Sequence, residues 1–126
     1  MKILVVEDEP SLLKIIKIYL SRQGHEITAC LSADSASERF SAAPSTYALM
    51  IVDMTLSGMP AEKLIDQALK RNPNIRAIAM SGDPGALDNL RERGHPRVAF
   101  LEKPFTPAML TGTLSEVLGR RSSAAG

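Results

Sequence analysis

The sequence contains a single cysteine, Cys30, among 126 residues. One thiol cannot form an internal disulfide, and it cannot supply a zinc site that is built on several cysteines. The chain also lacks any apolar run approaching the roughly 18 residues of a membrane-spanning helix. Its N-terminus reaches Glu7 and Asp8 after four apolar residues, which is not the pattern of a signal peptide. These absences predict a cytoplasmic protein that does not contact a membrane.

Neither sign of charge dominates the sequence. Fifteen Lys and Arg residues oppose fourteen Asp and Glu residues, so the formal net charge is +1 at pH 7. Such a chain has no broad basic field that would attract nucleic acid. Arg120 and Arg121 are expected at the solvated end of the last helix, where positive charge complements the helix dipole. A length of 126 residues suits one domain, since domains hold roughly 100–200 residues.

Short apolar runs alternate with segments of helical periodicity along the whole chain. Because apolar runs without polar alternation suit strands that are buried on both faces, they predict a parallel sheet with helices on either side. We expect one domain over residues 1–120 and a disordered tail over residues 121–126. The expected strands are 3–6, 26–30, 47–52, 75–80 and 98–101, and the expected helices are 11–22, 33–40, 61–71, 84–93 and 107–118.

Polar side chains follow four of the five expected strands. Glu7 and Asp8 follow the first strand, Asp53 the third, Ser81 the fourth and Lys103 the fifth. Because ligands of an open parallel sheet bind outside the carboxyl ends of its strands, we expect these groups to share one crevice. Three carboxylates in one crevice repel each other unless a cation joins them. Oxygen ligands without clustered His or Cys favour a hard cation, of which Mg²⁺ is the typical one.

A metal ion, a lysine, a hydroxyl group and a carboxylate are the parts of a phosphoryl-transfer site. The carboxylate can itself be the nucleophile, which gives an acyl phosphate. Each residue also has a simpler interpretation: residues 7–10 could be an acid-rich helix start, Ser81 a turn residue and Lys103 a solvated lysine. Their coincidence at equivalent strand ends favours the site.

Four motifs together resemble the receiver domain of two-component response regulators. They are ILVVEDEP at residues 3–10, LMIVDM at 49–54, AMSG at 79–82 and FLEKPF at 100–105. Each motif alone is weak evidence for the family, but the four in this order and at these separations are specific to it. The resemblance covers residues 2–119. It implies a five-stranded parallel sheet of order 2-1-3-4-5, which is a doubly wound, flavodoxin-like α/β sandwich of three layers.

The resemblance implies that Asp53 is the phosphorylation site. It would accept the phosphoryl group from the phosphohistidine of a sensor histidine kinase or of a phosphotransfer protein. Asp8 and Asp53 would bind Mg²⁺ directly, together with the Thr55 carbonyl group. Glu7, at a position where the family more often has Asp, would act on the metal largely through water.

The resemblance also implies roles for residues beyond the carboxylates. Ser81 and Lys103 would contact the oxygens of the phosphoryl group as catalytic residues. Phe100 occupies the position of an aromatic side chain that switches conformation together with Ser81, although an aromatic residue in a strand is more often part of a core. The peptide bond from Lys103 to Pro104 is usually cis in this family.

The expected output is a conformational change that is recognised by a downstream protein or by the kinase carrying this domain. The domain itself is expected to be a monomer or a weak phosphorylation-dependent homodimer. The activities implied are autophosphorylation and slow autodephosphorylation rather than metabolic catalysis. One alternative is the C-terminal receiver of a hybrid histidine kinase. A Mg²⁺-dependent aspartyl phosphatase would have a second acid where Thr55 stands. A flavodoxin-like cofactor binder would have a Ser/Thr/Gly-rich loop where residues 7–10 stand.

Overall fold

The structure is a computed structural model, and it describes residues 1–120. The tail predicted at residues 121–126 lies outside the described residues. No described helix is long and apolar enough to cross a membrane. The strands are β1 (Lys2–Val6), β2 (Glu26–Cys30), β3 (Leu49–Asp53), β4 (Arg76–Ser81) and β5 (Val98–Glu102). The helices are α1 (Pro10–Arg22), α2 (Ala33–Ala42), the short 3-10 helix η1 (Pro44–Thr46), α3 (Ala61–Arg71), α4 (Gly85–Arg93) and α5 (Pro107–Gly119).

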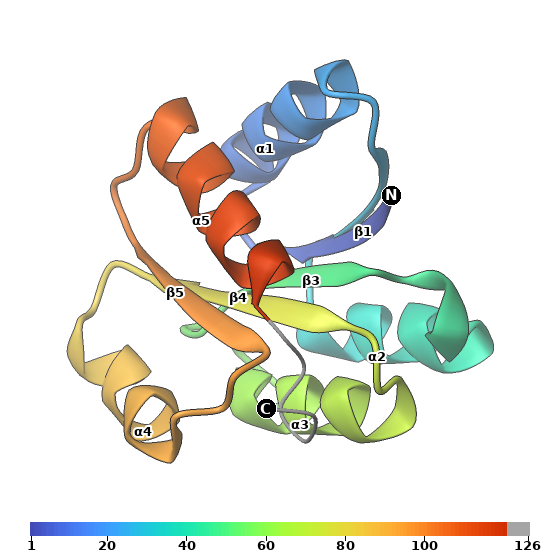
Figure 1. The fold of residues 1–126 in the computed structure, drawn as a ribbon, viewed down its shortest axis with the longest axis vertical. Coiled ribbons are helices and arrows are strands. Elements are labelled where there is room, and N and C mark those ends of the chain that lie inside the picture. Colours follow the sequence, from blue (N-terminus) through green and yellow to red (C-terminus); the bar gives the residue numbers. More distant parts are fainter. Residues whose placement is uncertain (121–126) are drawn as a thin grey trace.

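The five strands form one parallel sheet of order β2-β1-β3-β4-β5, which confirms the predicted fold and strand order (Figure 1). In its register, Val6 pairs with Val52, and Asp53 pairs with Met80. On the other side of β4, Ser81 pairs with Glu102. The strands therefore end at one edge of the sheet, as the predicted site requires.

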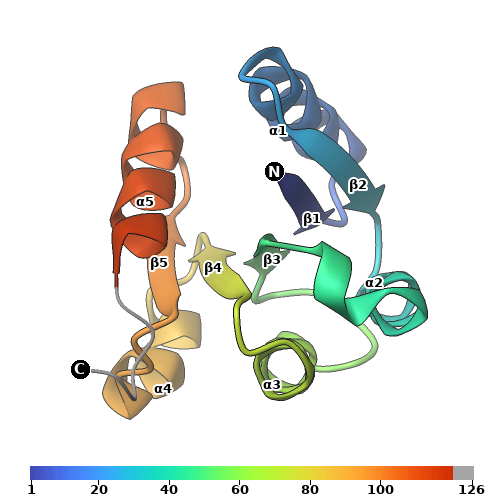
Figure 2. The ribbon, with the colours of Figure 1, turned by 45° about the vertical axis from the view of Figure 1, so that its right-hand side comes forward.

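Helices cover both faces of the sheet, with α1 and α5 on one side and α2, α3 and α4 on the other (Figure 2). Each side has its own apolar core, and strand side chains contribute to the two cores alternately. Val5, Ile51 and Leu101 belong to the α1–α5 core, so the residues two positions later continue on that side. Those residues are Glu7, Asp53 and Lys103. Ala79 belongs to the opposite core, so Ser81 continues on the α4 side.

Strand β3 begins at Leu49, two residues later than predicted. The apolar character of Tyr47 suggested a strand, but this residue follows the 3-10 helix and its side chain is buried instead. Its ring stacks on Phe40 with 6.2 Å between centroids. Its carbonyl group accepts a hydrogen bond from the Asn72 amide at 2.8 Å. Tertiary packing of a large ring, rather than strand pairing, therefore places Tyr47.

Helix α4 begins at Gly85, one residue later than predicted. Pro84 precedes the helix with backbone angles that are already helical, φ −56° and ψ −34°. The Asp83 carboxylate accepts a hydrogen bond from the Gly85 backbone N–H at 3.0 Å. Asp83 thus binds a free N–H group at the helix start, which is what capping residues do.

Arg120 is half-buried at the end of α5, and its side chain makes contacts that the prediction of a solvated helix end does not include. Its guanidinium donates a hydrogen bond to the Val98 carbonyl at 2.8 Å and pairs with Glu116. The Arg76 guanidinium in turn donates to the carbonyl groups of Val117 and Arg120, at 3.1 and 2.7 Å. These contacts satisfy carbonyl groups that a helix leaves free at its end. Arg120 is therefore held between α5 and the start of β5, and Arg121 lies outside the described residues.

Candidate functional site

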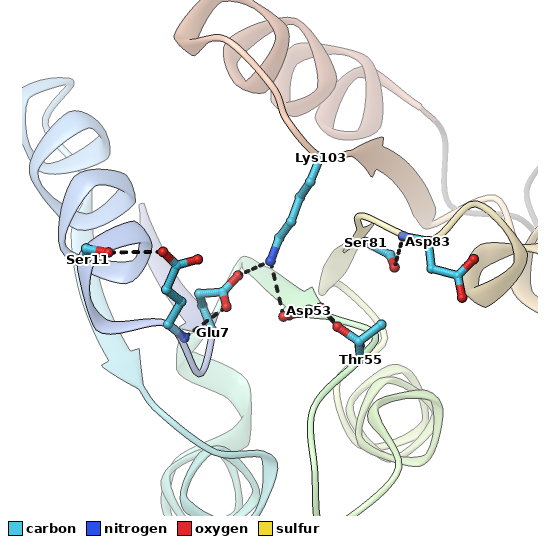
Figure 3. Close-up of polar contacts among 8 residues, drawn as sticks. Glu7, Ser11, Asp53, Thr55, Ser81, Asp83 and Lys103 are labelled. Carbon is cyan, nitrogen blue, oxygen red and sulfur yellow. Dashed lines mark hydrogen bonds and ion pairs between the residues drawn. The ribbon is translucent and has the colours of Figure 1, made fainter.

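Two carboxylates and one ammonium group meet at the carboxyl edge of the sheet (Figure 3). Lys103 Nζ donates hydrogen bonds to Glu7 Oε1 at 2.5 Å and to Asp53 Oδ2 at 3.2 Å. Glu7 is 1% exposed and Asp53 2% exposed, whereas the Lys103 side chain is 20% exposed. Lys103 is therefore a bridging cation that reaches two buried acids from the solvent side.

Thr55 holds the Asp53 carboxylate from the side opposite Lys103. The Thr55 backbone N–H and hydroxyl both donate to Asp53 Oδ1, at 3.0 and 2.8 Å. Burial works to raise the pKa of Asp53, but the hydrogen bonds from Thr55 and Lys103 outweigh it and hold that pKa below its usual value. Asp53 is therefore an anion at neutral pH, with each oxygen in a defined environment.

Glu7 has a different electrostatic setting from Asp53. Burial raises its pKa, and the hydrogen bonds from Lys103 and from the Glu9 backbone N–H offset only part of that rise. Burial alone would lower the pKa of Lys103, but its two carboxylate partners raise it instead. The two buried acids therefore depend on the charge of Lys103, and Glu7 depends on it most.

Asp8 completes a cluster of three acids. One carboxylate oxygen from each of Glu7, Asp8 and Asp53 lies within 4.8 Å of the other two, and Asp8 is exposed. With Lys103 counted, three negative charges face one positive charge, which leaves two negative charges uncompensated. A divalent cation would neutralise them, and oxygen donors of this kind suit Mg²⁺. The donor set therefore fits the predicted ion.

Phe100 packs against the core on the side of the sheet that α4 covers, and Ser81, two residues after Ala79 of that core, continues on the same side. Ser81 is fully buried, and its hydroxyl accepts a hydrogen bond from the Asp83 backbone N–H at 3.0 Å. Phe100 is half-buried and packs at the margin of the α2–α4 core. The Arg91 guanidinium lies over its ring, 5.2 Å from the centroid. The two predicted switch residues therefore lie on the same side of the sheet as α4.

The Lys103–Pro104 peptide bond is cis, as the resemblance implies. A groove of about 500 Å³ adjoins Lys103, so its side chain faces an open approach; the lining residues are Glu9, Leu12, Gly82, Lys103, Pro104 and Phe105. The sequence analysis did not predict a role for Glu9, whose backbone N–H donates a hydrogen bond to the Glu7 carboxylate at 3.1 Å. A backbone donor two residues away carries no residue-type signal, so the sequence could not reveal it.

A family model described as the response regulator receiver domain matches residues 3–115. The chain therefore belongs to the response regulator receiver domain family of two-component signalling, as its four motifs predicted. With this sheet order and site, it is a CheY-like receiver domain. The family implies a histidine kinase as a partner in general terms, and its members typically serve as phosphoacceptors.

Relatives of this chain differ in length. It is 29% identical over 125 residues to the regulatory protein VanRB of Enterococcus faecalis, covering 98% of this chain and 54% of VanRB. The chain thus spans about half the length of that relative. It is 28% identical to a chemotaxis protein CheY homolog of Campylobacter jejuni, covering 97% of this chain and 95% of the homolog. A response regulator receiver protein from Sinorhizobium medicae has a similar structure, with a TM-score of 0.83, 27% identity and 94% of each chain covered.

Proposed function

We propose that Asp53 accepts a phosphoryl group from the phosphohistidine of a histidine kinase or of a phosphotransfer protein. The single observation that carries the proposal is the Lys103 bridge between Asp53 and Glu7. The lowered pKa of Asp53 keeps its carboxylate ionised, so an oxygen of that carboxylate can attack phosphorus. A P–O bond to Asp53 forms as the P–N bond of phosphohistidine breaks, and the electron pair of that bond goes to the imidazole nitrogen.

Four residues would hold Mg²⁺ beside the acceptor. Asp8 and Asp53 offer carboxylate oxygens, Thr55 its carbonyl group, and Glu7 acts through water. The bound ion would supply neutralisation of the charge on the phosphoryl oxygens. Support comes from the acid cluster, in which one carboxylate oxygen of each acid lies within 4.8 Å of the other two. The three negative charges of this cluster exceed the single positive charge of Lys103.

Lys103 and Ser81 would bind phosphoryl oxygens. Lys103 Nζ already lies 3.2 Å from Asp53 Oδ2, so a group carried by that carboxylate would be within its reach. The Ser81 hydroxyl accepts from the Asp83 N–H and therefore keeps its own proton free to donate. Neither role requires either residue to exchange a proton with the substrate, because phosphoryl transfer needs chiefly positioning and charge neutralisation.

The phosphorylated site would signal through the α4 side of the sheet. The phosphoryl group adds negative charge and acceptor oxygens, which draw Ser81 and its loop inward. The Phe100 ring, on the same face, would then move inward. A downstream protein or the kinase that carries this domain would bind the changed surface. We propose that the protein works in the cytoplasm as a monomer or weak dimer, with autophosphorylation and slow autodephosphorylation as its only catalytic activities.

Phosphorylation by acetyl phosphate or a phosphoramidate tests this function. Intact-protein mass spectrometry should show one added phosphoryl group in the presence of Mg²⁺ and none without it. Asp53→Asn should abolish the mass gain, while the matched control Asp88→Asn, which changes an exposed acid of α4, should retain it. Equal labelling of Asp53→Asn and the unmodified protein would refute the assignment.

A further inference from the structure

One arginine of α4 contacts two side chains of β5. The Arg91 guanidinium lies 5.2 Å from the centroid of the Phe100 ring, within the range of a cation–π interaction. The same group lies 3.4 Å from Glu102 Oε1. Phe100 and Glu102 are two residues apart, so both point to the side that α4 covers. Arg91 therefore spans the half-buried ring and the acid at the end of β5.

The strand beside Phe100 leaves room for its ring. Ala79 of β4 is the register partner of Phe100, and Ser81 is the partner of Glu102. The direct neighbours on β4 are therefore a methyl group and a hydroxymethyl group. Neither group is large enough to hold the Phe100 ring in one position by steric contact. Phe100 is only partly buried at the margin of the core. The Arg91 guanidinium is the charged group that lies over this ring.

Helix α4 is otherwise held to the domain by few side chains. Only Leu87 and Leu90 of this helix are buried. A second arginine, Arg93, ties the helix to α3 through Glu62 at 2.8 Å and Asp66 at 2.7 Å. The two arginines thus hold the same helix on different sides, one to β5 and the other to α3. Arg93 does not contact Phe100, so it is a matched control for Arg91.

We infer that Arg91 is a positioning residue that holds the Phe100 ring in its half-exposed place and so opposes inward movement of that ring. The inference rests on the proposed function in one respect, namely that phosphorylation favours the inward ring. A contact made only with the outward ring stabilises the resting state, and its removal shifts the equilibrium toward the other state. A cation–π contact at a partly exposed site changes such an equilibrium about two- to fivefold.

Fluorine NMR of the full chain tests the inference. Incorporation of 4-fluorophenylalanine labels three sites, and Phe100→Leu identifies the Phe100 signal. The shift of that signal between H₂O and D₂O reports how far the ring is exposed to solvent. In Arg91→Ala the Phe100 signal should move toward the position that it takes in the unmodified protein with Mg²⁺ and beryllofluoride, because loss of the contact raises the inward population about two- to fivefold. A solvent shift that rises with no movement toward that position would show that the ring stays in place without Arg91, and that result would overturn the inference.

Two further variants separate the cation–π contact from a general loosening of α4. Arg91→Lys should keep the Phe100 signal near its original position, because an ammonium group can also lie over the ring. Arg93→Ala should leave the signal unchanged. A change in Arg93→Ala as large as that in Arg91→Ala would contradict a role specific to Arg91.

Beryllofluoride, a mimic of the phosphoryl group, links the ring to the proposed function. Arg91→Ala should bind it about two- to fivefold more tightly than the unmodified protein, and Arg93→Ala should not. If the unmodified protein failed to bind beryllofluoride with Mg²⁺, the proposed function would be wrong. The comparison of solvent shifts in the resting proteins would still decide whether Arg91 holds the ring.

Discussion

Replacement of Lys103 by Met would remove the one positive charge that bridges Glu7 and Asp53. Methionine keeps much of the length of the side chain and loses both contacts, of 2.5 and 3.2 Å. The two carboxylates are almost fully buried, so they would remain as uncompensated charges. The variant therefore measures how far the folded state depends on this bridge.

The magnitude follows from the burial of the two acids. Removal of one partner from a buried ion pair costs about 3–5 kcal/mol. The Lys103 side chain is 20% exposed, so water can reach the site, and we expect a lower loss of about 2–3 kcal/mol at pH 7. Without Lys103 the pKa of Glu7, already raised by burial, rises further. A raised pKa in the folded state favours the protonated acid, so the loss must shrink as the pH falls toward the ordinary carboxyl pKa.

Urea unfolding at pH 7 and pH 5 measures this loss, with Lys14→Met as the control for an exposed lysine. The Lys103→Met variant should be clearly destabilised at pH 7, less so at pH 5, and partly restored by millimolar Mg²⁺. The control should unfold like the unmodified protein. A Lys103→Met variant as stable as the unmodified protein at pH 7, or destabilised equally at both pH values, would contradict a dependence of the folded state on the Lys103 bridge.

Three other predictions concern the metal, a helix end and pH. At ten times its Kd, Mg²⁺ should stabilise the protein by about 1.4 kcal/mol in thermal unfolding, and persistence of that gain in Asp8→Ala would place the ion elsewhere. Arg97→Ala should lower the free energy of unfolding by about 2 kcal/mol, because the Arg97 guanidinium donates to three carbonyl groups at and just beyond the end of α3. An unchanged midpoint of urea unfolding would contradict this prediction. Burial, then the charges of Arg97 and Arg93, lower the pKa of His95 from its ordinary value of 6.5. Its contribution to stability is therefore complete above pH 6.5 and is lost as the pH falls from there through the lower pKa of the folded state. His95→Gln should therefore flatten the pH dependence of stability between pH 7 and pH 5, and an unchanged slope would argue against it.

The order and type of the elements could be predicted because this sheet is buried on both faces. Strands such as β1 and β3 then become uninterrupted apolar runs, which stand out against the helical periodicity of the segments between them. The acids and Lys103 could be placed together because parallel strands end at one edge. Their alternation along the strands also puts Glu7, Asp53 and Lys103 on the same side.

The features that escaped prediction depend on contacts between distant parts of the chain. The Tyr47 ring belongs to the core beside Phe40, although its residue type suggested a strand. Arg120 is tied to the Val98 carbonyl, although its place at a helix end suggested solvent. Arg91 lies over Phe100 because α4 crosses beside β5. Long side chains choose such partners only after the fold has formed, so no local pattern encodes them.

Chemical identification of the phosphorylated residue tests most directly whether Asp53 is the phosphoryl acceptor. Reduction with borohydride after treatment with acetyl phosphate and Mg²⁺ converts an aspartyl phosphate into homoserine, which tandem mass spectrometry locates in the sequence. We predict homoserine at position 53, formed only when Mg²⁺ is present and absent from Asp53→Asn. Reduction at Asp8 or at any other acid, with Asp53 intact, would contradict the assignment of Asp53 as the acceptor.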